Sequence, residues 1–309
     1  MSMDIDRFMR VCYNTRYNLN GGTKMTLTTT LKMLEDAKNN SYAVAAFNCE
    51  NMEMIQGVID AGKGLDSPVI IQTTPTTVRY GSIDLYPANV SAAAKDAPIP
   101  VALMLDHGNS HEVVSEAIKA GYSSIMIDGS TLPLEENIAF TKYAVSLCRK
   151  NRLPVEGELG RVGGKEDDTE SEECGYTNPN EAVRFVEETG VSSLAIGVGT
   201  AHGVYTVQPV LKPELISEIR DRVMVPLVLH GASGLNHDVI RDCIKRGINK
   251  VNFATELRIT YTQAIRKCLN SDKDIFDPKK YGMAGREAVK KLAMELITLC
   301  GCKGRAIDR

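Results

Sequence analysis

Three of the five histidines each stand at the end of a short apolar run: His107, His202 and His230. Runs of this length and composition are typical of buried parallel strands, whose carboxyl ends meet at one edge of a sheet. A trio of neutral imidazoles with an open fourth position is how proteins hold a catalytic zinc ion. One histidine alone would more often serve packing or capping, but three at equivalent positions favour a metal site. The sequence therefore predicts a metal enzyme.

Carboxylates accompany the histidines at the ends of these runs. Asp106 directly precedes His107, where it could either support the imidazole or transfer a proton, and the sequence leaves both roles open. Glu156 and Glu158 alternate along the fifth run, so they share one face of it, and Asp128 follows the fourth run. Because buried carboxylates are costly unless paired or metal-bound, these groups either form a second metal position or orient the histidines.

A long acidic segment, residues 160–175, follows the fifth run and contains the pair Gly163-Gly164. Acidic loops are usually just solvated. One that lies over a site, with a glycine pair to absorb backbone rotation, is a candidate lid. On this interpretation Glu166 moves into and out of the site with the lid.

Small and hydroxyl-bearing residues follow the last two apolar runs. At the carboxyl ends of strands and before helix N-termini, such residues form phosphate-binding sites, although each motif alone is equally typical of a turn. The two together predict a phosphate pocket, to which Gly203 adds a backbone N–H. The predicted pocket residues are Gly203, Gly231, Ala232, Ser233, Asn252, Ala254 and Thr255.

Two other mechanisms are disfavoured by what the runs lack. Lys250 lies at the opposite end of the eighth run, and no lysine stands at the carboxyl end of a predicted strand, so a Schiff-base mechanism is not expected. The first run lacks a His-x-His pair, which argues against the metal-dependent amidohydrolases.

The elements that must position these residues alternate regularly from Met25 onward. Eight strands, each followed by a helical stretch, predict a single (β/α)8 barrel of the α/β class, in which chemistry lies at the carboxyl ends of strands. A doubly wound sheet would need a glycine-rich turn after the first strand, and Asn48 and its neighbours provide none. The predicted strands are residues 43–48, 68–73, 100–108, 123–129, 154–160, 193–200, 226–233 and 250–255.

Extra helices are expected at both ends of the barrel, Thr28–Asn39 closing its bottom and Lys279–Leu299 near the C-terminus. We find no linker, so residues 25–309 form one predicted domain. Residues 1–24 are polar and form a separate N-terminal extension, either a real arm or the product of a misassigned start codon, and we favour the second.

Composition narrows the class of protein. A hydrophobic content of 43%, a charged content of 24% and a net charge of −3 fit a globular enzyme and argue against nucleic acid or an anionic membrane as the main partner. No stretch is apolar enough to cross a bilayer. The eight cysteines have no paired spacing, so we expect reduced thiols and a cytoplasmic location.

Six motifs, in this order, resemble the zinc-dependent class II ketose-bisphosphate aldolases, and the resemblance runs from about Leu27 to Arg305. The motifs are Leu105-Asp-His-Gly, Met126-Ile-Asp-Gly-Ser, Glu156-Gly-Glu-Leu-Gly-Arg-Val-Gly-Gly, Gly199-Thr-Ala-His-Gly, Leu229-His-Gly-Ala-Ser and Lys250-Val-Asn-Phe-Ala-Thr-Glu-Leu.

The resemblance implies roles for these residues. His107, His202 and His230 become ligands of one catalytic Zn²⁺, with Glu158 and Asp128 at an auxiliary metal position. Asp106 becomes the acid/base at the C4 hydroxyl, and Glu166 moves a proton on dihydroxyacetone phosphate. The predicted pocket, with Asn48, binds the phosphosugar, with a monovalent cation (Na⁺ or K⁺) nearby. A homodimer or homotetramer acting in carbohydrate metabolism or glycolysis is expected.

Substrate choice depends on the eighth strand. Fructose-bisphosphate members usually read Asn-x-Asp-Thr-Asp there, whereas Ala254 replaces the first aspartate here and resembles the tagatose-bisphosphate branch. Arg258 resembles a distal-phosphate arginine of the fructose branch, and Lys279 stands where many relatives carry a phosphate-binding arginine from the neighbouring subunit. We therefore expect cleavage of D-tagatose 1,6-bisphosphate into dihydroxyacetone phosphate and glyceraldehyde 3-phosphate.

The alternatives are fructose 1,6-bisphosphate or another ketose phosphate as the substrate of the same reaction. From a different class, a metal-dependent phosphosugar isomerase or hydrolase could use the same barrel. A catalytically inactive binding protein is a third possibility, against which the intact Asp106 and histidine trio argue.

Overall fold

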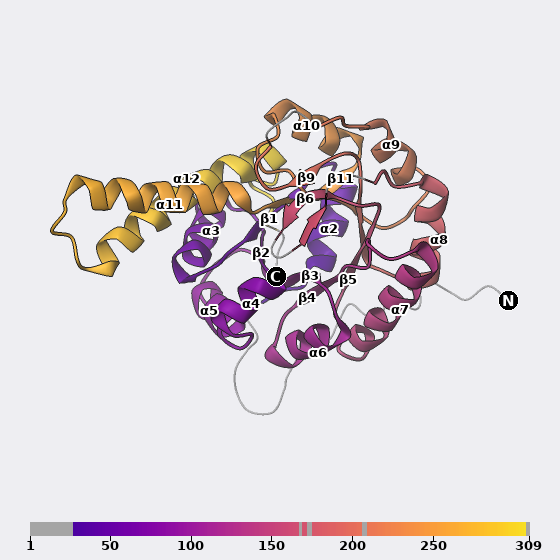
Figure 1. The fold of residues 1–309 in the computed structure, drawn as a ribbon, viewed down its shortest axis with the longest axis horizontal. Coiled ribbons are helices and arrows are strands. Elements are labelled where there is room, and N and C mark those ends of the chain that lie inside the picture. Colours follow the sequence, from indigo (N-terminus) through magenta and orange to yellow (C-terminus); the bar gives the residue numbers. More distant parts are fainter. Residues whose placement is uncertain (1–26, 167–168, 172–174, 206–208, 307–309) are drawn as a thin grey trace.

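Eight parallel strands close into a barrel in the computed structural model, which describes residues 27–166, 169–171, 175–205 and 209–306 (Figure 1). Around the ring the order is β1, β11, β10, β8, β5, β4, β3 and β2. The predicted (β/α)8 barrel is therefore confirmed. The barrel strands are β1 (Val44–Asn48), β2 (Val69–Thr73), β3 (Val101–Gly108), β4 (Ser124–Ile127), β5 (Val155–Leu159), β8 (Ser193–Ile196), β10 (Leu227–Leu229) and β11 (Ile248–Phe253).

Helices form the outer ring around these strands (Figure 1). They are α3 (Met52–Leu65), α4 (Pro75–Gly81), α5 (Leu85–Ala94), α6 (His111–Ala120), α7 (Leu134–Lys150), α8 (Pro179–Thr189), α9 (Glu214–Arg220), α10 (His237–Arg246), α11 (Thr255–Ser271) and α12 (Pro278–Cys300). Local chemistry sets several of their ends. Ser110 caps α6 by accepting the Val113 N–H, and Gly121 ends it in the left-handed region.

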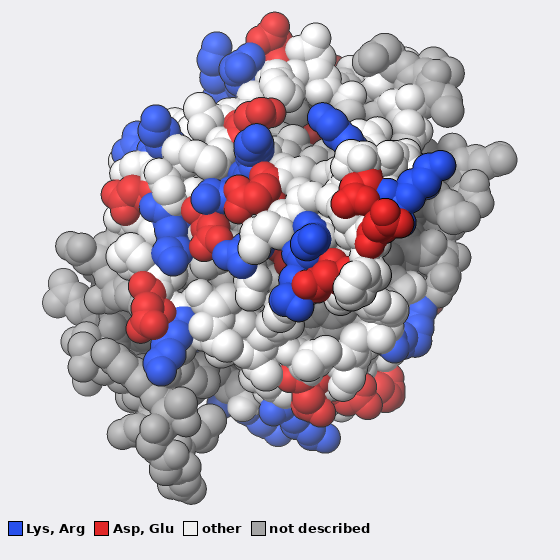
Figure 2. Space-filling model, turned by 90° about the vertical axis from the view of Figure 1, so that its left-hand side faces the viewer, with Lys and Arg blue, Asp and Glu red and all other residues white. Residues whose placement is uncertain are grey.

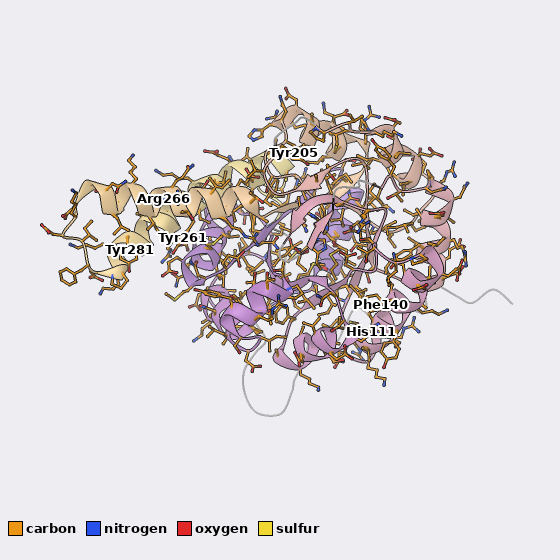
Figure 3. All side chains as sticks on the ribbon, in the orientation of Figure 1. His111, Phe140, Tyr205, Tyr261, Arg266 and Tyr281 are labelled. Carbon is orange, nitrogen blue, oxygen red and sulfur yellow. The ribbon has the colours of Figure 1, made fainter. Side chains whose placement is uncertain are left out.

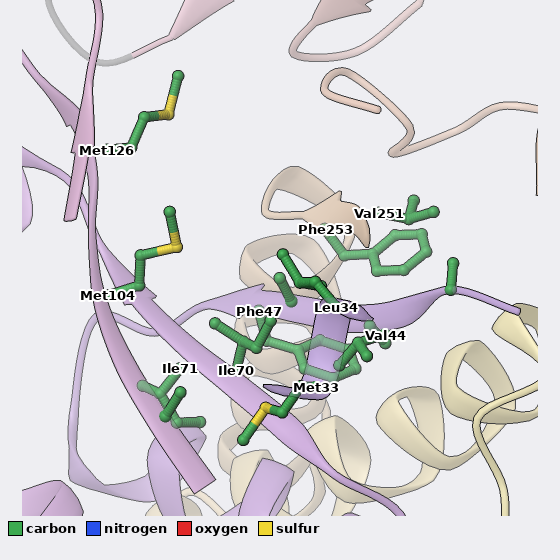
Figure 4. Packing of buried hydrophobic residues seen from close by; sticks show 14 of the residues in the cluster. Met33, Leu34, Val44, Phe47, Ile70, Ile71, Met104, Met126, Val251 and Phe253 are labelled. Atoms are coloured by element: carbon green, nitrogen blue, oxygen red, sulfur yellow. The ribbon is translucent and has the colours of Figure 1, made fainter. Parts of the chain in front are cut away.

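The extra N-terminal helix closes the bottom of the barrel, as predicted. In α2 (Thr30–Asn39), the Thr30 N–H donates to Ser124 Oγ at the start of β4 (2.9 Å). Met33 and Leu34 project from this helix into the core beside Val44 and Phe47 (Figure 4). Burying such side chains contributes roughly 1.5–3 kcal/mol each, so α2 fixes the end of the barrel that lies away from the chemistry.

The segment predicted as a lid is not simply a loop. Its described part forms β6 (Gly163–Glu166) and β7 (Thr169–Ser171), and β6 pairs in parallel with β9 (Ala201–His202). The predicted strand over residues 193–200 is correspondingly shorter, because the chain leaves the barrel after Ile196 and pairs again only at β9. Residues 1–24, predicted as an extension, lie outside the described residues.

A hairpin of two helices projects from the barrel wall. Figure 1 shows α11 and the first half of α12 reaching outward, and Figure 3 places Tyr261, Arg266 and Tyr281 along it. We call this hairpin, residues 255–290, the arm. Apolar side chains on it face solvent, with Phe276 89% exposed and Met283 52% exposed.

The distribution of surface charge fits the small net charge of the sequence. On the face in Figure 2, the described acidic and basic side chains are interspersed, and neither sign forms a continuous patch. Among the described helices, not one combines the length and apolarity that a membrane span requires. The six described cysteines are all free thiols.

Candidate active site

The three histidines predicted as metal ligands lie together at the carboxyl end of the barrel. His107 belongs to β3, His202 to β9, and His230 directly follows β10. The ring centroid of His107 is 5.2 Å from that of His202 and 4.7 Å from that of His230. One nitrogen from each ring lies within 4.8 Å of the other two, a spacing that allows one ion to reach all three.

Asp128 determines which nitrogen of His107 faces this centre. His107 Nδ1 lies 2.7 Å from Asp128 Oδ2, and Ser130 N–H donates to the other carboxylate oxygen. Burial alone would raise the pKa of Asp128, but the His107 hydrogen bond and charge outweigh it and hold the pKa well below its ordinary value. An ionised carboxylate only accepts, so Nδ1 carries the proton and Nε2 presents its lone pair.

Glu156 determines which nitrogen of His230 faces the centre, and it does so by contacting Nε2, whereas Asp128 contacts Nδ1 of His107. His230 Nε2 lies 3.0 Å from Glu156 Oε1, deep inside the barrel. Burial alone would raise the pKa of Glu156, but Lys250 and the His230 hydrogen bond hold it at about 2. Burial lowers the pKa of His230, which favours the neutral imidazole. Nε2 therefore carries the proton, and Nδ1 presents its lone pair.

These two tautomers leave lone pairs facing each other, because His107 Nε2 and His230 Nδ1 are only 2.9 Å apart. Two acceptors at this distance repel unless a cation lies against both. Imidazole nitrogens with carboxylates on their other nitrogens are typical zinc ligands, so the residues present fit a divalent metal. Glu158 Oε2 lies 3.7 Å from His230 Nδ1, and Glu158 forms a second potential ligand group with His107 and Asp128.

Asp106 lies beside this centre and is fully buried. Three side-chain amides donate to its carboxylate: Asn48 Nδ2 at 2.8 Å, Gln72 Nε2 at 2.8 Å and Asn252 Nδ2 at 3.2 Å. Asn252 Nδ2 is also 3.2 Å from His230 Nε2, but both of these nitrogens are donors, so only the carboxylate accepts.

The backbone is strained at His107, and this brings the side chains of Asp106 and His107 to the same end of the barrel. Neighbouring residues in a strand normally point to opposite faces, yet His107 adopts φ +46°, in the left-handed region. This conformation curls the end of β3. Strain of this kind costs on the order of 1–3 kcal/mol and is concentrated at functional sites.

A pocket opens next to the histidines and contains eight of the ten residues predicted to bind substrate. The Tyr205 hydroxyl fixes its wall, because it accepts from Ala201 N–H (2.8 Å) and donates to the Gly231 carbonyl (2.7 Å). The lining residues are Asn48, His202, Gly203, Gly231, Ser233, Asn252, Ala254, Thr255 and Arg258.

The other two predicted residues lie elsewhere. Ala232 is buried beside the pocket but does not line it. Lys279 is 86% exposed at the start of α12, on the arm, and its amine pairs with Asp277 (2.9 Å). Within one chain it therefore contributes nothing to the pocket.

The hairpin of β6 and β7, the predicted lid, which we call the lid hairpin, pairs through its backbone with the strand that carries His202. Gly164 pairs with His202 across β6 and β9, with Gly164 at φ +86°. Glu166 is at the end of β6, with its backbone opposite Thr169. Its side chain lies outside the described part of the chain, so its predicted role stays a prediction.

Several residues around the site were missed by sequence reasoning. Gln72 near the end of β2 is a polar residue in the run Val-Ile-Ile-Gln-Thr, a signal that could have been used. Lys250, interpreted as lying at the wrong end of its strand, is mid-strand and fully buried, with Nζ on both oxygens of Glu156. Glu50 binds Arg258 Nε (2.6 Å), a contact across 208 residues that no local pattern predicts.

Comparisons with known proteins find similarity over almost the whole chain. The family model of class-II fructose-bisphosphate aldolases matches residues 28–305. The YdjI aldolase from Escherichia coli K12 is 39% identical, with a TM-score of 0.80, over 91% of this chain and 100% of that chain. A putative fructose-1,6-bisphosphate aldolase from Coccidioides immitis is 28% identical, with a TM-score of 0.82, over 90% and 98%. A fructose-bisphosphate aldolase from Campylobacter jejuni shares the fold at 22% identity and a TM-score of 0.75, over 88% and 94%.

Proposed function

This chain belongs to the class-II fructose-bisphosphate aldolase family, and from that premise we propose that it reversibly cleaves D-tagatose 1,6-bisphosphate. The products are dihydroxyacetone phosphate and glyceraldehyde 3-phosphate. The observation that carries the proposal is that three imidazoles able to share one ion lie close to the buried carboxylate of Asp106, since Asn252 Nδ2 lies 3.2 Å from both Asp106 Oδ1 and His230 Nε2.

In this proposal His107, His202 and His230 hold Zn²⁺, and Glu158 and Asp128 lie at an auxiliary metal position. When bound, the ion supplies Lewis-acid stabilisation of the negative charge that develops on the ketose oxygens. No lysine imine is needed, because the only ammonium described inside the barrel, that of Lys250, is held by Glu156.

Asp106 performs the proton transfer. Its carboxylate accepts the proton of the C4 hydroxyl as the C3–C4 bond breaks, and C4 leaves as the aldehyde. The bonding electron pair stays on the three-carbon fragment as an enediolate, and protonation at C3 by Glu166 completes dihydroxyacetone phosphate. The amides of Asn48, Gln72 and Asn252 hold the Asp106 carboxylate in one orientation throughout.

The pocket recognises the ketone-side phosphate. Gly203, Gly231, Ser233 and Thr255 bring backbone N–H groups and hydroxyls to one place, and Thr255 begins α11, whose N-terminus favours an anion. A monovalent cation, Na⁺ or K⁺, belongs beside this phosphate in our proposal.

The preference for tagatose rests on Ala254. Tagatose and fructose bisphosphates differ only in configuration at C4, and Ala254 brings no carboxylate to the pocket near that carbon. Arg258 at the pocket edge reaches toward the distal phosphate, while Glu50 pairs with it and reduces its free charge. Such a distal contact is weaker than that of an unpaired arginine.

The test is product trapping with the purified protein. The zinc-loaded protein should release both triose phosphates from tagatose 1,6-bisphosphate, with a higher kcat/KM than for fructose 1,6-bisphosphate, and a chelator should abolish the reaction. Equal kcat/KM for the two epimers would refute the role of Ala254. No triose phosphate from any ketose bisphosphate, with isomerised sugar or inorganic phosphate instead, would replace the aldolase by an isomerase or hydrolase.

We further propose that residues 25–309 act as one domain in a cytoplasmic homodimer or homotetramer of carbohydrate metabolism. The arm supports this assembly, because its exposed apolar residues lack a partner within the described chain. In such an assembly Lys279 reaches the distal phosphate of a neighbouring subunit.

A further inference from the structure

Three buried side chains, those of Lys250, Glu156 and His230, are joined by consecutive polar contacts inside the barrel. Lys250 Nζ contacts both oxygens of Glu156, at 3.0 and 2.9 Å, and Glu156 Oε1 accepts from His230 Nε2 at 3.0 Å. All three side chains are at most 1% exposed. The three residues come from different strands: Glu156 lies in β5, His230 follows β10, and Lys250 lies in β11, the neighbour of β10 in the ring.

Burying this ion pair has a stability cost that the fold alone does not require. Desolvating an ammonium and a carboxylate costs several kcal/mol each, and well-packed apolar side chains often replace such pairs without loss. Neither Lys250 nor Glu156 is among the residues that line the pocket, and the Lys250 ammonium is engaged by both oxygens of Glu156. Glu156 contacts His230 directly, and Lys250 reaches that imidazole only through Glu156, which points to a role exerted through His230.

We infer that Lys250 and Glu156 are positioning residues that fix His230 as an Nδ1 ligand and set the affinity of the site for its metal. One ammonium on both oxygens prevents the Glu156 carboxylate from rotating, so Oε1 stays on His230 Nε2. A charged acceptor on one ring nitrogen increases the basicity of the other. This inference rests on the proposed metal site.

The imidazole of His107 is held differently from that of His230. Its carboxylate partner, Asp128, is 21% exposed and receives a backbone N–H from Ser130, with no cation on it in the described structure. His230 instead depends on two side chains from other strands, Glu156 of β5 and, through it, Lys250 of β11. The loss of Lys250 should therefore affect the metal centre through His230 alone.

The experiment measures zinc affinity independently of turnover. Metal-free Lys250→Met and Glu156→Gln proteins are titrated with Zn²⁺ against a chromophoric chelator. We expect the dissociation constant to rise about 10- to 100-fold in each. The control is Arg286→Met, which removes the ion pair between α12 and Asp60 of α3, remote from the site, and should leave zinc affinity unchanged.

A double variant, Glu156→Gln/Lys250→Met, keeps the test decisive if a single variant fails to fold, because it leaves no unpaired buried charge. We expect it to fold and still bind zinc more weakly than the wild type. Folded Lys250→Met or double-variant protein with wild-type zinc affinity would overturn the positioning role. Absence of zinc binding by the wild-type protein would instead refute the proposed metal site, and this inference with it.

Discussion

At the scale of single residues, Asp106 is held by dipoles rather than by charges. Its three described donors are the amides of Asn48, Gln72 and Asn252, none of which is a cation. The amide oxygens of the same three residues are buried and have no hydrogen-bond partner. The donors therefore satisfy the carboxylate while each keeps an unused acceptor beside it, available for substrate hydroxyls or water.

If Asp106 transfers the proton, Asp106→Ala should lower kcat by about two orders of magnitude or more. The histidines remain, so zinc content, measured by elemental analysis of the purified variant, should stay near that of the wild type. An equal loss of zinc and of activity would make Asp106 only a support for the imidazoles.

Glu256, in the first turn of α11, gives a prediction about pH. Burial raises the pKa of its carboxyl to about 7, and the negative charge of Glu295 adds to this increase. The hydrogen bond with Ser233 acts in the opposite direction and only partly offsets it. The unfolded chain releases this proton near the ordinary value of 4.5, whereas the folded chain keeps it to about 7. The free energy of unfolding therefore falls as pH rises through this window and stays lower above it.

Glu256→Gln removes this penalty. The free energy of unfolding of the variant minus that of the wild type should increase from pH 5 to pH 8, by on the order of 1 kcal/mol or more. Urea unfolding of the metal-free proteins at both pH values measures the difference. A stability difference that is the same at pH 5 and pH 8 would contradict the raised pKa.

At the scale of elements, the lid hairpin and a predicted metal ligand share one small sheet. β6 pairs with β9, which carries His202, so movement of the hairpin and the position of this imidazole are linked. A Cβ at Gly164 would lie 2.2 Å from the His202 carbonyl oxygen, far inside contact distance. The glycine is therefore required by the close approach of the two strands as well as by its positive φ.

Gly164→Ala should separate β6 from β9, reduce kcat/KM at least about tenfold and weaken zinc binding, measured by chelator competition. Gly121→Ala is the matched control. Gly121 has φ +99° at the end of α6, but nothing lies within 4 Å of a Cβ there. The control should lose stability without losing zinc affinity. If both variants bound zinc like the wild type, the link between lid and ligand would be wrong.

At the scale of the whole molecule, the exposed apolar side chains of the arm are the feature on which the proposed assembly rests. The arm exposes Phe276, Met283 and Leu269, and the described chain folds nothing over them. In the proposed assembly, a neighbouring subunit covers this apolar surface. Because Lys279 lies on the same arm, assembly would also bring its ammonium to another subunit.

We expect light scattering after gel filtration to give a dimer or tetramer for the wild type and a smaller species for Phe276→Asp/Met283→Asp. Charges placed in an apolar interface are desolvated without partners, so they oppose association. Met224→Asp, at a residue 87% exposed outside the arm, should leave the mass unchanged. A wild-type protein that is monomeric at micromolar concentration would contradict the proposed assembly.

The barrel was predictable because parallel strands buried on both faces appear in the sequence as continuous apolar runs, and the histidines mark where these runs end. The link from Lys250 to Glu156 was not predictable. It crosses 94 residues and depends on how β5, β8, β10 and β11 are aligned around the ring. The short strands of the lid were missed as well, because they are polar and too brief to show alternation.

The separation of the histidines along the chain constrains the order of events during folding. His107 and His230 lie 123 residues apart, and β3 and β10 are not neighbours in the ring. A growing chain that ends before His230 holds only part of the predicted ligand set, so no ion can be held by all three imidazoles until β10 has been made. The predicted metal centre therefore forms late, and only in chains whose strands β3 and β10 have taken their places in the ring.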